Sequence, residues 1–162
     1  MMKYLCVFDL DNTLLSPDQT ISRENIDAIQ NLRDLDIGVS LATGRSPLMI
    51  GRYVEMLSLR LPIIACNGAL LILPAGNERD MEDKSRSVQG NERGFSGNGR
   101  GFSGNYKILQ ENPIQSQIAE SLLLYMLEQQ ADFLAYTGHM VYHSKGSCRV
   151  DNFNKYNQSV PS

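Results

Sequence analysis

The chain has 162 residues, with 15 basic and 18 acidic side chains and a formal net charge of −3. This length suits one mid-sized domain, and 42% apolar residues are enough to fill a core. The mildly acidic balance argues against a nucleic-acid partner, and no apolar run is long enough to span a bilayer. The three cysteines are far apart (Cys6, Cys66 and Cys148), which argues against a disulfide framework or zinc site and predicts a cytoplasmic protein.

The first 66 residues alternate strand patterns with helix patterns. A short apolar run at 4–8 ends at Asp9 and predicts a buried central strand. Ser22 is the expected N-cap of a helix, which Gly38 is expected to stop. One face of that helix carries a stripe of apolar residues: Ile26, Ile29, Leu32 and Leu35.

Two further strands and one helix complete this pattern. Strands are predicted at 37–42 and 62–66, and between them lies a helix capped by Ser46 with Pro47 in its first turn. Asn67-Gly68 favours a tight hairpin turn, after which 69–73 returns as a strand. Because strand, helix, strand, helix and strand follow in order, the predicted fold class is α/β, with a partial doubly wound, Rossmann-like sheet.

The middle of the chain has low complexity. Between 75 and 105 there is almost no hydrophobic periodicity, and two seven-residue units, 93–99 and 100–106, differ only in their last position. Such a segment buries too little apolar surface to offset its ordering entropy, so we expect a disordered Gly-rich insertion. The alternative is RNA contact through the repeated Arg-Gly-Phe units, which predicts affinity that falls steeply with salt.

Regular patterns return at residue 106. A strand is predicted at 106–109, and Asn112-Pro113 marks the expected start of a helix that runs to about Gln130. Its expected apolar face consists of Ile114, Ile118, Leu122, Tyr125 and Met126. Strands at 133–137 and 140–143 flank Gly138-His139, which predicts a hairpin and a small α+β unit.

Two acidic residues follow the first strand, Asp9 and Asp11 in Phe8-Asp9-Leu10-Asp11-Asn12-Thr13. Open α/β sheets bind their ligands at this carboxyl edge. Two carboxylates so close repel each other, and a magnesium ion would hold both ionised. One carboxylate can attack a phosphoryl group while the other transfers protons. The alternative is an ordinary polar loop.

Thr43-Gly44-Arg45 follows the second strand at the same edge and opens a helix. A hydroxyl, an unhindered glycine amide and a helix N-terminus form a good cradle for a phosphate. Arg45 would add positive charge to that cradle, and pairing with a nearby carboxylate is an equally good alternative. A simple helix cap explains one such site alone, but two sites on adjacent strands favour a phosphate-directed function.

These motifs resemble the haloacid dehalogenase superfamily of phosphatases. Asp9-x-Asp11-x-Thr13 is similar to its first motif, and Thr43 with Gly44 and Arg45 is similar to its second. Asn67-Gly68-Ala69 resembles the junction where Cof-type sugar phosphatases leave the core for a C2-type cap, and 111–138 resembles the first part of that cap.

The resemblance implies roles for these residues. Asp9 would be the nucleophile and a magnesium ligand, while Asp11 would be the acid/base and ligate magnesium through its backbone carbonyl. The phosphate would be held by the Leu10 amide, the Thr43 hydroxyl and the Gly44 amide, with Arg45 beside them. Thr13 would orient the loop.

The chain also departs from the family pattern. A third-motif Lys and a fourth, acidic motif are not found, and Lys145, Asp151 and Lys155 read as surface residues. The core strands that would flank the first strand are also not found, so that strand is expected to be an open edge. We therefore expect a truncated chain, which a complementing C-terminal fragment would complete.

The expected organisation is part of a hydrolase core at 1–68, the start of a cap at 69–74, the insertion at 75–105 and a partial cap at 106–162. The expected function is a Mg²⁺-dependent phosphomonoesterase that acts through an aspartyl phosphate on a small phosphorylated metabolite such as a sugar phosphate. The alternatives are a catalytically dead binding module and, within the superfamily, an enzyme like phosphomannomutase or trehalose-phosphate phosphatase. Neither a membrane nor a nucleic acid is the expected partner.

Overall fold

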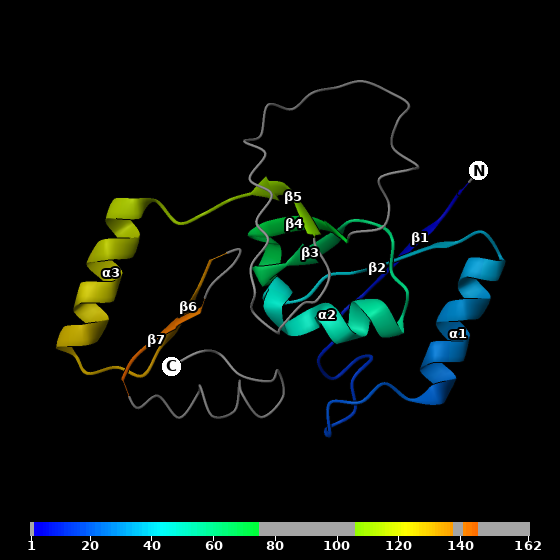
Figure 1. Ribbon diagram of the computed structural model, residues 1–162, viewed down its shortest axis with the longest axis horizontal. Coiled ribbons are helices and arrows are strands. Elements are labelled where there is room, and N and C mark those ends of the chain that lie inside the picture. The colour runs from blue at the N-terminus through cyan, green and yellow to red at the C-terminus, as the bar shows by residue number, and fades with distance from the viewer. Residues whose placement is uncertain (1, 75–105, 138–140, 146–162) are drawn as a thin grey trace.

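A computed structural model describes residues 2–74, 106–137 and 141–145 (Figure 1). The predicted insertion at 75–105, the hairpin tip Gly138-His139 and the tail from residue 146 lie outside the described residues.

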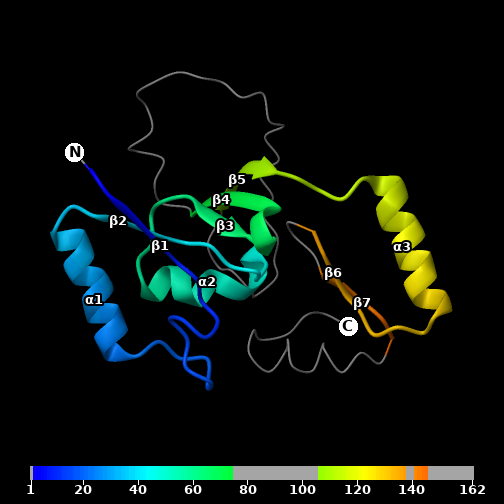
Figure 2. The ribbon, with the colours of Figure 1, turned by 180° about the vertical axis from the view of Figure 1, so that it is seen from behind.

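The N-terminal part alternates strands and helices, as predicted. Strand β1 (Leu5–Phe8) pairs in parallel with β2 (Gly38–Leu41), and helix α1 (Arg23–Asp34) connects them. After helix α2 (Pro47–Met56), strand β3 (Ile63–Ala65) lies beside the end of β2, joined by a parallel bridge between Ala42 and Ile64. Figure 2 shows these elements from behind. The α/β fold class is confirmed.

Antiparallel strands follow. A short 3-10 turn, Cys66–Gly68, leads into β4 (Leu70–Pro74), which pairs with β3 and with β5 (Tyr106–Glu111). The returning strand after Asn67-Gly68 is therefore confirmed, and β5 is longer than predicted.

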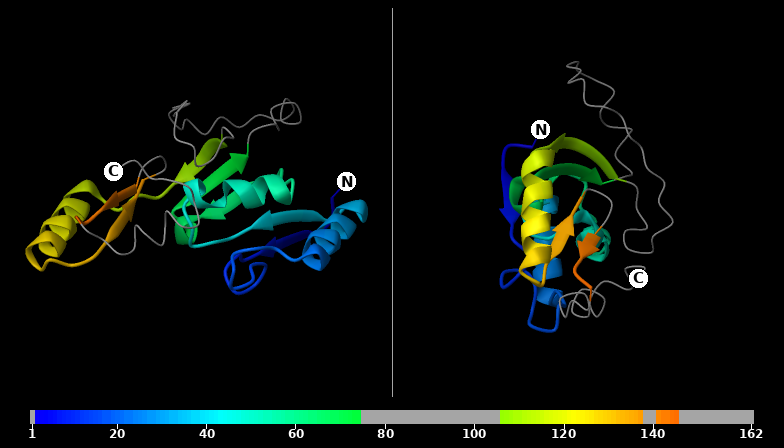
Figure 3. Two further views of the ribbon diagram at one scale, coloured as in Figure 1. Left: turned by 60° about the horizontal axis from the view of Figure 1, so that its bottom comes forward. Right: turned by 90° about the vertical axis from the view of Figure 1, so that its left-hand side faces the viewer.

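The last described elements are helix α3 (Ser116–Glu128) and the antiparallel pair β6 (Leu134–Tyr136) and β7 (Val141–His143). The predicted pairing of the last two strands is confirmed. Figures 1 and 3 show α3 beside this pair, at the end of the molecule away from α1.

The core lies where α2 packs on the strands. Its fully buried side chains include Leu10, Leu41, Ile50, Ile63 and Ile72. Burying each such side chain stabilises the fold by about 1.5–3 kcal/mol. Because the core includes Leu10 and residues at the ends of β2 and β3, it fixes the loops at one edge of the sheet.

The prediction of a buried central strand at 4–8 is wrong. Among the described residues β1 pairs only with β2, and its side chains Leu5 and Val7 are 54% and 47% exposed. No described strand pairs with its other edge, and the face of β1 that carries Leu5 and Val7 is open to solvent. The expectation of an open edge agrees with this arrangement.

Gly38 does not stop the first helix, contrary to the prediction. α1 ends at Asp34, and Asp36 takes the left-handed conformation (φ 60°) that reverses the chain. Gly38 is the first residue of β2, where a Cβ would come too close to Met2 Sδ and lie 2.8 Å from Leu61 Cδ1, so these side chains would have to shift. The glycine therefore serves close packing.

The apolar stripe predicted for the first helix ends before its last residue, because Leu35 is 72% exposed.

The predicted helix start at Asn112-Pro113 is also wrong. α3 begins at Ser116, and the residue before it, Gln115, makes no side-chain capping hydrogen bond. The predicted apolar residues Ile118, Leu122 and Tyr125 lie on α3, but all three are exposed. α3 buries none of its residues, so tertiary packing contributes little to its position.

Candidate active site

Backbone hydrogen bonds bring the carboxyl ends of three strands together. The Ala42 amide donates to the Phe8 carbonyl (2.9 Å), and the Thr43 amide donates to the Ile64 carbonyl (3.0 Å). The residues that follow β1 and β2 therefore meet at one edge of the sheet, as the sequence predicts, and those that follow β3 join them there.

A buried leucine shapes the acidic loop. Leu10 is fully buried, and its carbonyl accepts hydrogen bonds from the amides of Thr13 (3.3 Å), Leu14 (3.1 Å) and Leu15 (2.9 Å). This turn folds the chain back directly after β1. It leaves Asp9 exposed at the end of the strand and Asp11 half-buried beside it.

Arg45 forms a two-pronged ion pair with Asp11. Its Nε donates to Asp11 Oδ2 (2.9 Å) and its Nη2 to Asp11 Oδ1 (2.5 Å). The Arg45 side chain is 10% exposed and that of Asp11 44%. The hydrogen bond and charge of Arg45 outweigh partial burial and hold the pKa of Asp11 below its ordinary value. Burial alone would lower the pKa of Arg45, but Asp11 raises it.

This pairing bears on the two roles considered for Arg45. The structure shows the carboxylate pairing, and the phosphate contact stays a prediction. The Arg45 guanidinium, next to Asp11, also supplies part of the positive charge that offsets the repulsion between the Asp9 and Asp11 carboxylates.

The Thr43–Arg45 loop is tied to the turn after β3. The Asn67 amide donates to the Thr43 carbonyl (3.1 Å), and the Cys66 amide donates to the Arg45 carbonyl (3.0 Å). Thr43 is buried, and its Oγ1 accepts a hydrogen bond from the Arg45 amide (3.2 Å). Gly44 is exposed, and a Cβ there would lie 2.9 Å from Asn67 Oδ1. Glycine therefore fits here without displacing Asn67.

The helix after this loop begins without its expected cap. Ser46 and Pro47 occupy the predicted positions, but Ser46 makes no side-chain capping bond. Its Oγ is buried and has no hydrogen-bond partner within the described part of the chain. The N-terminus of α2 thus lies directly after the predicted phosphate cradle, with its positive dipole end unneutralised by an acidic residue in the first turn.

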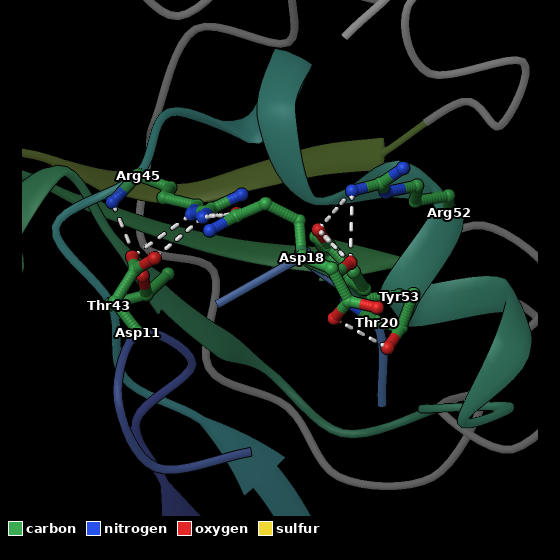
Figure 4. A network of polar contacts seen from close by, with 8 residues as sticks. Asp11, Asp18, Thr20, Thr43, Arg45, Arg52 and Tyr53 are labelled. Carbon is green, nitrogen blue, oxygen red and sulfur yellow. Dashed lines mark hydrogen bonds and ion pairs between the residues drawn. The ribbon is translucent and has the colours of Figure 1, made fainter. Parts of the chain in front are cut away.

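Sequence reasoning missed a second group of residues around Arg45. Nη2 of Arg45 also donates to Gln19 Oε1, and its guanidinium lies 5.6 Å from the centroid of the Tyr53 ring. Figure 4 shows Arg45 beside Thr43 and Asp11, and Arg52 beside Tyr53. Gln19 lies in a loop without periodicity and Tyr53 reads as a core residue of α2, so no local pattern connects them to Asp11.

The groups that Asp9 and Asp11 offer as metal ligands are oxygen atoms, the ligand type that Mg²⁺ prefers. Asp9 offers an exposed carboxylate, whereas the carboxylate of Asp11 is already bound by Arg45. Within the described ranges no group of three or more His, Cys, Asp or Glu side chains is placed to hold a metal ion. Asp9 and the backbone of Asp11 thus fit magnesium in chemistry but form an incomplete ligand set.

The cysteines and His143 give no evidence for or against a role in this site. Cys6 and Cys66 are free thiols, and burial raises the pKa of the Cys66 thiol, as fits a half-buried structural cysteine. His143 is half-buried beside the Ser144 carbonyl (3.0 Å). In the part of the chain that the structure describes, no helix is both long and apolar enough to cross a membrane.

Comparison with known proteins gives related chains. Over 71 residues the chain is 39% identical to the 5-amino-6-(5-phospho-D-ribitylamino)uracil phosphatase YitU of Bacillus subtilis (strain 168). That match covers 44% of this chain and 26% of YitU, so the chain spans only a part of the length of this relative.

Solved structures share the fold. The HAD subclass IIB sugar phosphatase BT4131 superposes with a TM-score of 0.69 at 15% identity, over 98% of this chain and 51% of that protein. A haloacid dehalogenase-like hydrolase from Bacteroides thetaiotaomicron gives 0.66 at 19% identity, over 97% and 50%. TM0651 from Thermotoga maritima gives 0.62 at 21% identity, over 96% and 46%. The chain thus spans about half the length of these structures.

The family model for haloacid dehalogenase-like hydrolases matches residues 6–89, which is more than half of the chain. This range contains both the Asp9–Asp11 loop and the Thr43–Arg45 loop. By this match, by the fold and by the meeting of those two loops at one sheet edge, the chain belongs to the haloacid dehalogenase-like hydrolases.

Proposed function

We propose that the chain carries the nucleophile and phosphate cradle of a phosphomonoesterase. The observation that carries this proposal is the meeting of Asp9-Leu10-Asp11 with Thr43-Gly44 at the carboxyl edge of β1 and β2, set by the hydrogen bond between Ala42 and Phe8. A nucleophilic carboxylate and a glycine-containing loop at a helix N-terminus are the two parts that phosphoryl transfer to a side chain needs.

In this proposal the Asp9 carboxylate attacks the phosphorus atom and the bond to the leaving oxygen breaks, which gives an aspartyl phosphate. The Leu10 amide, the Thr43 hydroxyl and the Gly44 amide would hold the phosphoryl oxygens. Water then attacks phosphorus, which releases inorganic phosphate and restores the Asp9 carboxylate. Asp9 suits the first step because its side chain is exposed at the end of β1.

Asp11 would move the protons. Its carboxyl group gives a proton to the leaving oxygen and, once ionised, takes one from the attacking water. Because Arg45 lowers the pKa of Asp11, the pair as built favours the ionised form and hence the second of these steps. For the first step Asp11 must carry a proton, so its ion pair with Arg45 must weaken while substrate is bound.

The Asp9 carboxylate and the Asp11 backbone carbonyl would hold a magnesium ion. When bound, such an ion neutralises charge on the phosphate and the nucleophile.

The proposed substrate is a small phosphorylated metabolite such as a sugar phosphate. The printed names of two similar proteins support this class, since one is a phosphatase of a phosphorylated ribitylaminouracil and another is a sugar phosphatase. Enzymes like phosphomannomutase or trehalose-phosphate phosphatase stay alternatives, which a screen of phosphorylated sugars would separate. The free thiols of Cys6 and Cys66 support a reducing compartment such as the cytoplasm.

A phosphatase assay tests the proposal. The 162-residue chain is incubated with p-nitrophenyl phosphate and Mg²⁺, and released phosphate is measured for the wild type, Asp9→Asn and Asp27→Asn. Asp27 is the matched control because it is an exposed aspartate on α1. We expect turnover that Asp9→Asn abolishes and Asp27→Asn leaves unchanged. Turnover at background in the wild type contradicts the proposal for this chain alone.

A second candidate is a binding module without turnover. It is favoured by the engagement of the Asp11 carboxylate with Arg45 and by the incomplete ligand set among the described residues. This candidate predicts that inorganic phosphate binds, as measured by ³¹P NMR line broadening, while no phosphomonoester is hydrolysed.

A complementing C-terminal fragment is the proposed partner. Among the described strands β1 pairs only with β2, so its other edge is where an added strand would pair, and the similar solved structures are about twice as long as this chain. Co-purification with the C-terminal half of such a phosphatase, lost when β1 is altered, would support this partner.

A further inference from the structure

Gln19, in the loop between the acidic motif and α1, forms hydrogen bonds with two residues of α2. Its backbone carbonyl accepts hydrogen bonds from Tyr53 Oη (3.1 Å) and Arg52 Nη2 (3.1 Å). The Arg52 guanidinium lies over the Tyr53 ring, 4.5 Å from its centroid, and also donates to the Tyr53 hydroxyl. Gln19 itself takes the left-handed conformation (φ 64°), which is uncommon for a residue with a side chain.

The Gln19 side chain reaches the ion pair of the candidate site. Its Oε1 accepts a hydrogen bond from Arg45 Nη2, the same nitrogen that donates to Asp11 Oδ1. The Arg45 guanidinium therefore has Asp11 and Gln19 as acceptors, and it lies 5.6 Å from the centroid of the Tyr53 ring. Tyr53 is buried, so its ring is a fixed support.

Holding the Arg45 side chain in place lowers the entropic cost of forming its ion pair with Asp11. A two-pronged guanidinium–carboxylate pair forms only when the two planar groups face each other edge to edge. An arginine side chain loses much of its rotamer freedom when it is held in one geometry. Contacts that hold Arg45 before Asp11 is engaged therefore reduce the entropy that the pair must lose.

We propose that Gln19 is a positioning residue: it holds the Arg45 guanidinium in the plane of the Asp11 carboxylate, and Tyr53 fixes the Gln19 backbone for this task. The effect on turnover rests on the proposed function, in which Asp11 moves the protons. The effect on Arg45 does not rest on it.

The test measures Arg45 directly. Solvent exchange of the Arg45 Nε–H is followed by ¹⁵N NMR in the 162-residue chain and in Gln19→Ala, Gln19→Glu and Gln30→Ala. Gln30 is the matched control, because it is a glutamine on the exposed face of α1 that bonds Asp34 and Arg33. Gln19→Ala removes the hydrogen bond from Nη2, so the guanidinium should leave the plane of the Asp11 carboxylate more often. The Nε–H, which donates to Asp11 Oδ2, should then exchange roughly tenfold faster. Gln19→Glu keeps the acceptor oxygen and should restore slow exchange, and Gln30→Ala should not change it.

A second variant keeps the test decisive if Gln19→Ala does not fold. Tyr53→Phe removes one of the two donors to the Gln19 carbonyl and keeps the ring near Arg45, so exchange should also speed up, by a smaller factor. Exchange that stays at the wild-type rate in Gln19→Ala, or in Tyr53→Phe where the former is unfolded, overturns the proposal.

Turnover of p-nitrophenyl phosphate separates this proposal from the proposed function. In an active chain we expect Gln19→Ala to lower kcat by roughly tenfold with little change in KM, because a loosened Arg45 no longer holds Asp11 in the ionised form that takes a proton from the attacking water in the second step. Faster exchange with unchanged kcat would overturn the action of Gln19 through Asp11. Faster exchange in a chain whose wild type has no turnover supports the positioning of Arg45 and counts against the proposed function alone.

Discussion

Asp11 and Arg45 are 34 positions apart, and their ion pair ties the loop after β1 to the start of α2. A partly exposed pair is worth little in water, because solvent screens it. This one has two parallel hydrogen bonds, and a buried guanidinium supplies them. The pair therefore has the geometry in which a charge–charge contact outweighs the cost of ordering two side chains.

The pair gives stability a pH dependence. Because Arg45 lowers the pKa of Asp11 from its ordinary 3.8, the folded chain is stabilised above about pH 4, and this stabilisation is lost as the pH falls through the lowered pKa. In urea unfolding, Arg45→Met should therefore cost more stability at pH 6 than at pH 3. Arg23→Met, which removes an exposed pair with Asp27, should cost little at either pH. A cost for Arg45→Met that is the same at both pH values would contradict this reading.

Single residues also show where sequence reasoning stops. The placement of Asp9, Asp11 and Thr43 at one sheet edge could be predicted, because parallel strands bring their carboxyl ends together. The choice of partner for Arg45 could not, because the proposed phosphate cradle and the Asp11 carboxylate are both at that edge and only side-chain packing decides between them. The contact with Gln19 depends on a left-handed loop residue that has no sequence signature.

Helix starts offer a matched comparison at the level of secondary structure. Ser22 caps α1 through a hydrogen bond from the Asn25 amide (3.2 Å), whereas the Ser46 hydroxyl at the start of α2 is buried without a partner in the described ranges. A capping bond is worth about 1 kcal/mol, and an unpaired buried hydroxyl contributes nothing or destabilises.

We therefore expect Ser22→Ala to lower the free energy of unfolding by about 1 kcal/mol. Ser46→Ala should leave it unchanged or raise it slightly, because it removes an unpaired polar atom from the interior. Urea unfolding followed by circular dichroism measures both. Equal losses in the two variants would show that Ser46 has a partner in solution.

Elements were predictable where local chemistry decides them. The start of α1 follows from Ser22 alone, and the α1–β2 turn was misassigned because Asp36, with no glycine, takes the left-handed conformation. The predicted start of α3 is wrong because Pro113 favours the first turn of a helix but does not require one there. In addition, α3 buries none of its residues, so packing does not determine where the helix begins. Packing, which periodicity can only suggest, decides such boundaries.

Two apolar surfaces distinguish the molecule as a whole. One is β1, which has exposed Leu5 and Val7 and one edge that no described strand pairs with. The other is the exposed apolar side of α3 with Ile118 and Leu122. An unpaired strand edge beside exposed apolar side chains is a site for strand–strand association. Sequence periodicity predicted both apolar patterns but could not show which would lack a covering layer.

This exposure predicts self-association through β1. In sedimentation velocity, the weight-average sedimentation coefficient of the wild type should rise with concentration, and Val7→Lys should reduce that rise because a charge blocks strand pairing. Ala28→Lys places the same charge on the exposed surface of α1 and should have no effect. Equal behaviour of both variants would argue that β1 is not the associating edge.

The turn that joins β3 to β4 contains an Asn-Gly pair whose asparagine can change chemically, and this limits how long the site keeps its original residues. Asn67 is exposed in a left-handed conformation, and the next residue, Gly68, has open space where a side chain would begin. An unhindered glycine amide can attack the preceding asparagine side chain, expel ammonia and, after hydrolysis, leave a carboxylate. Since the Asn67 side chain lies against Gly44, such ageing would bring a negative charge next to the proposed phosphate cradle. Stored protein would then differ from freshly prepared protein in its affinity for anions, although both come from the same gene.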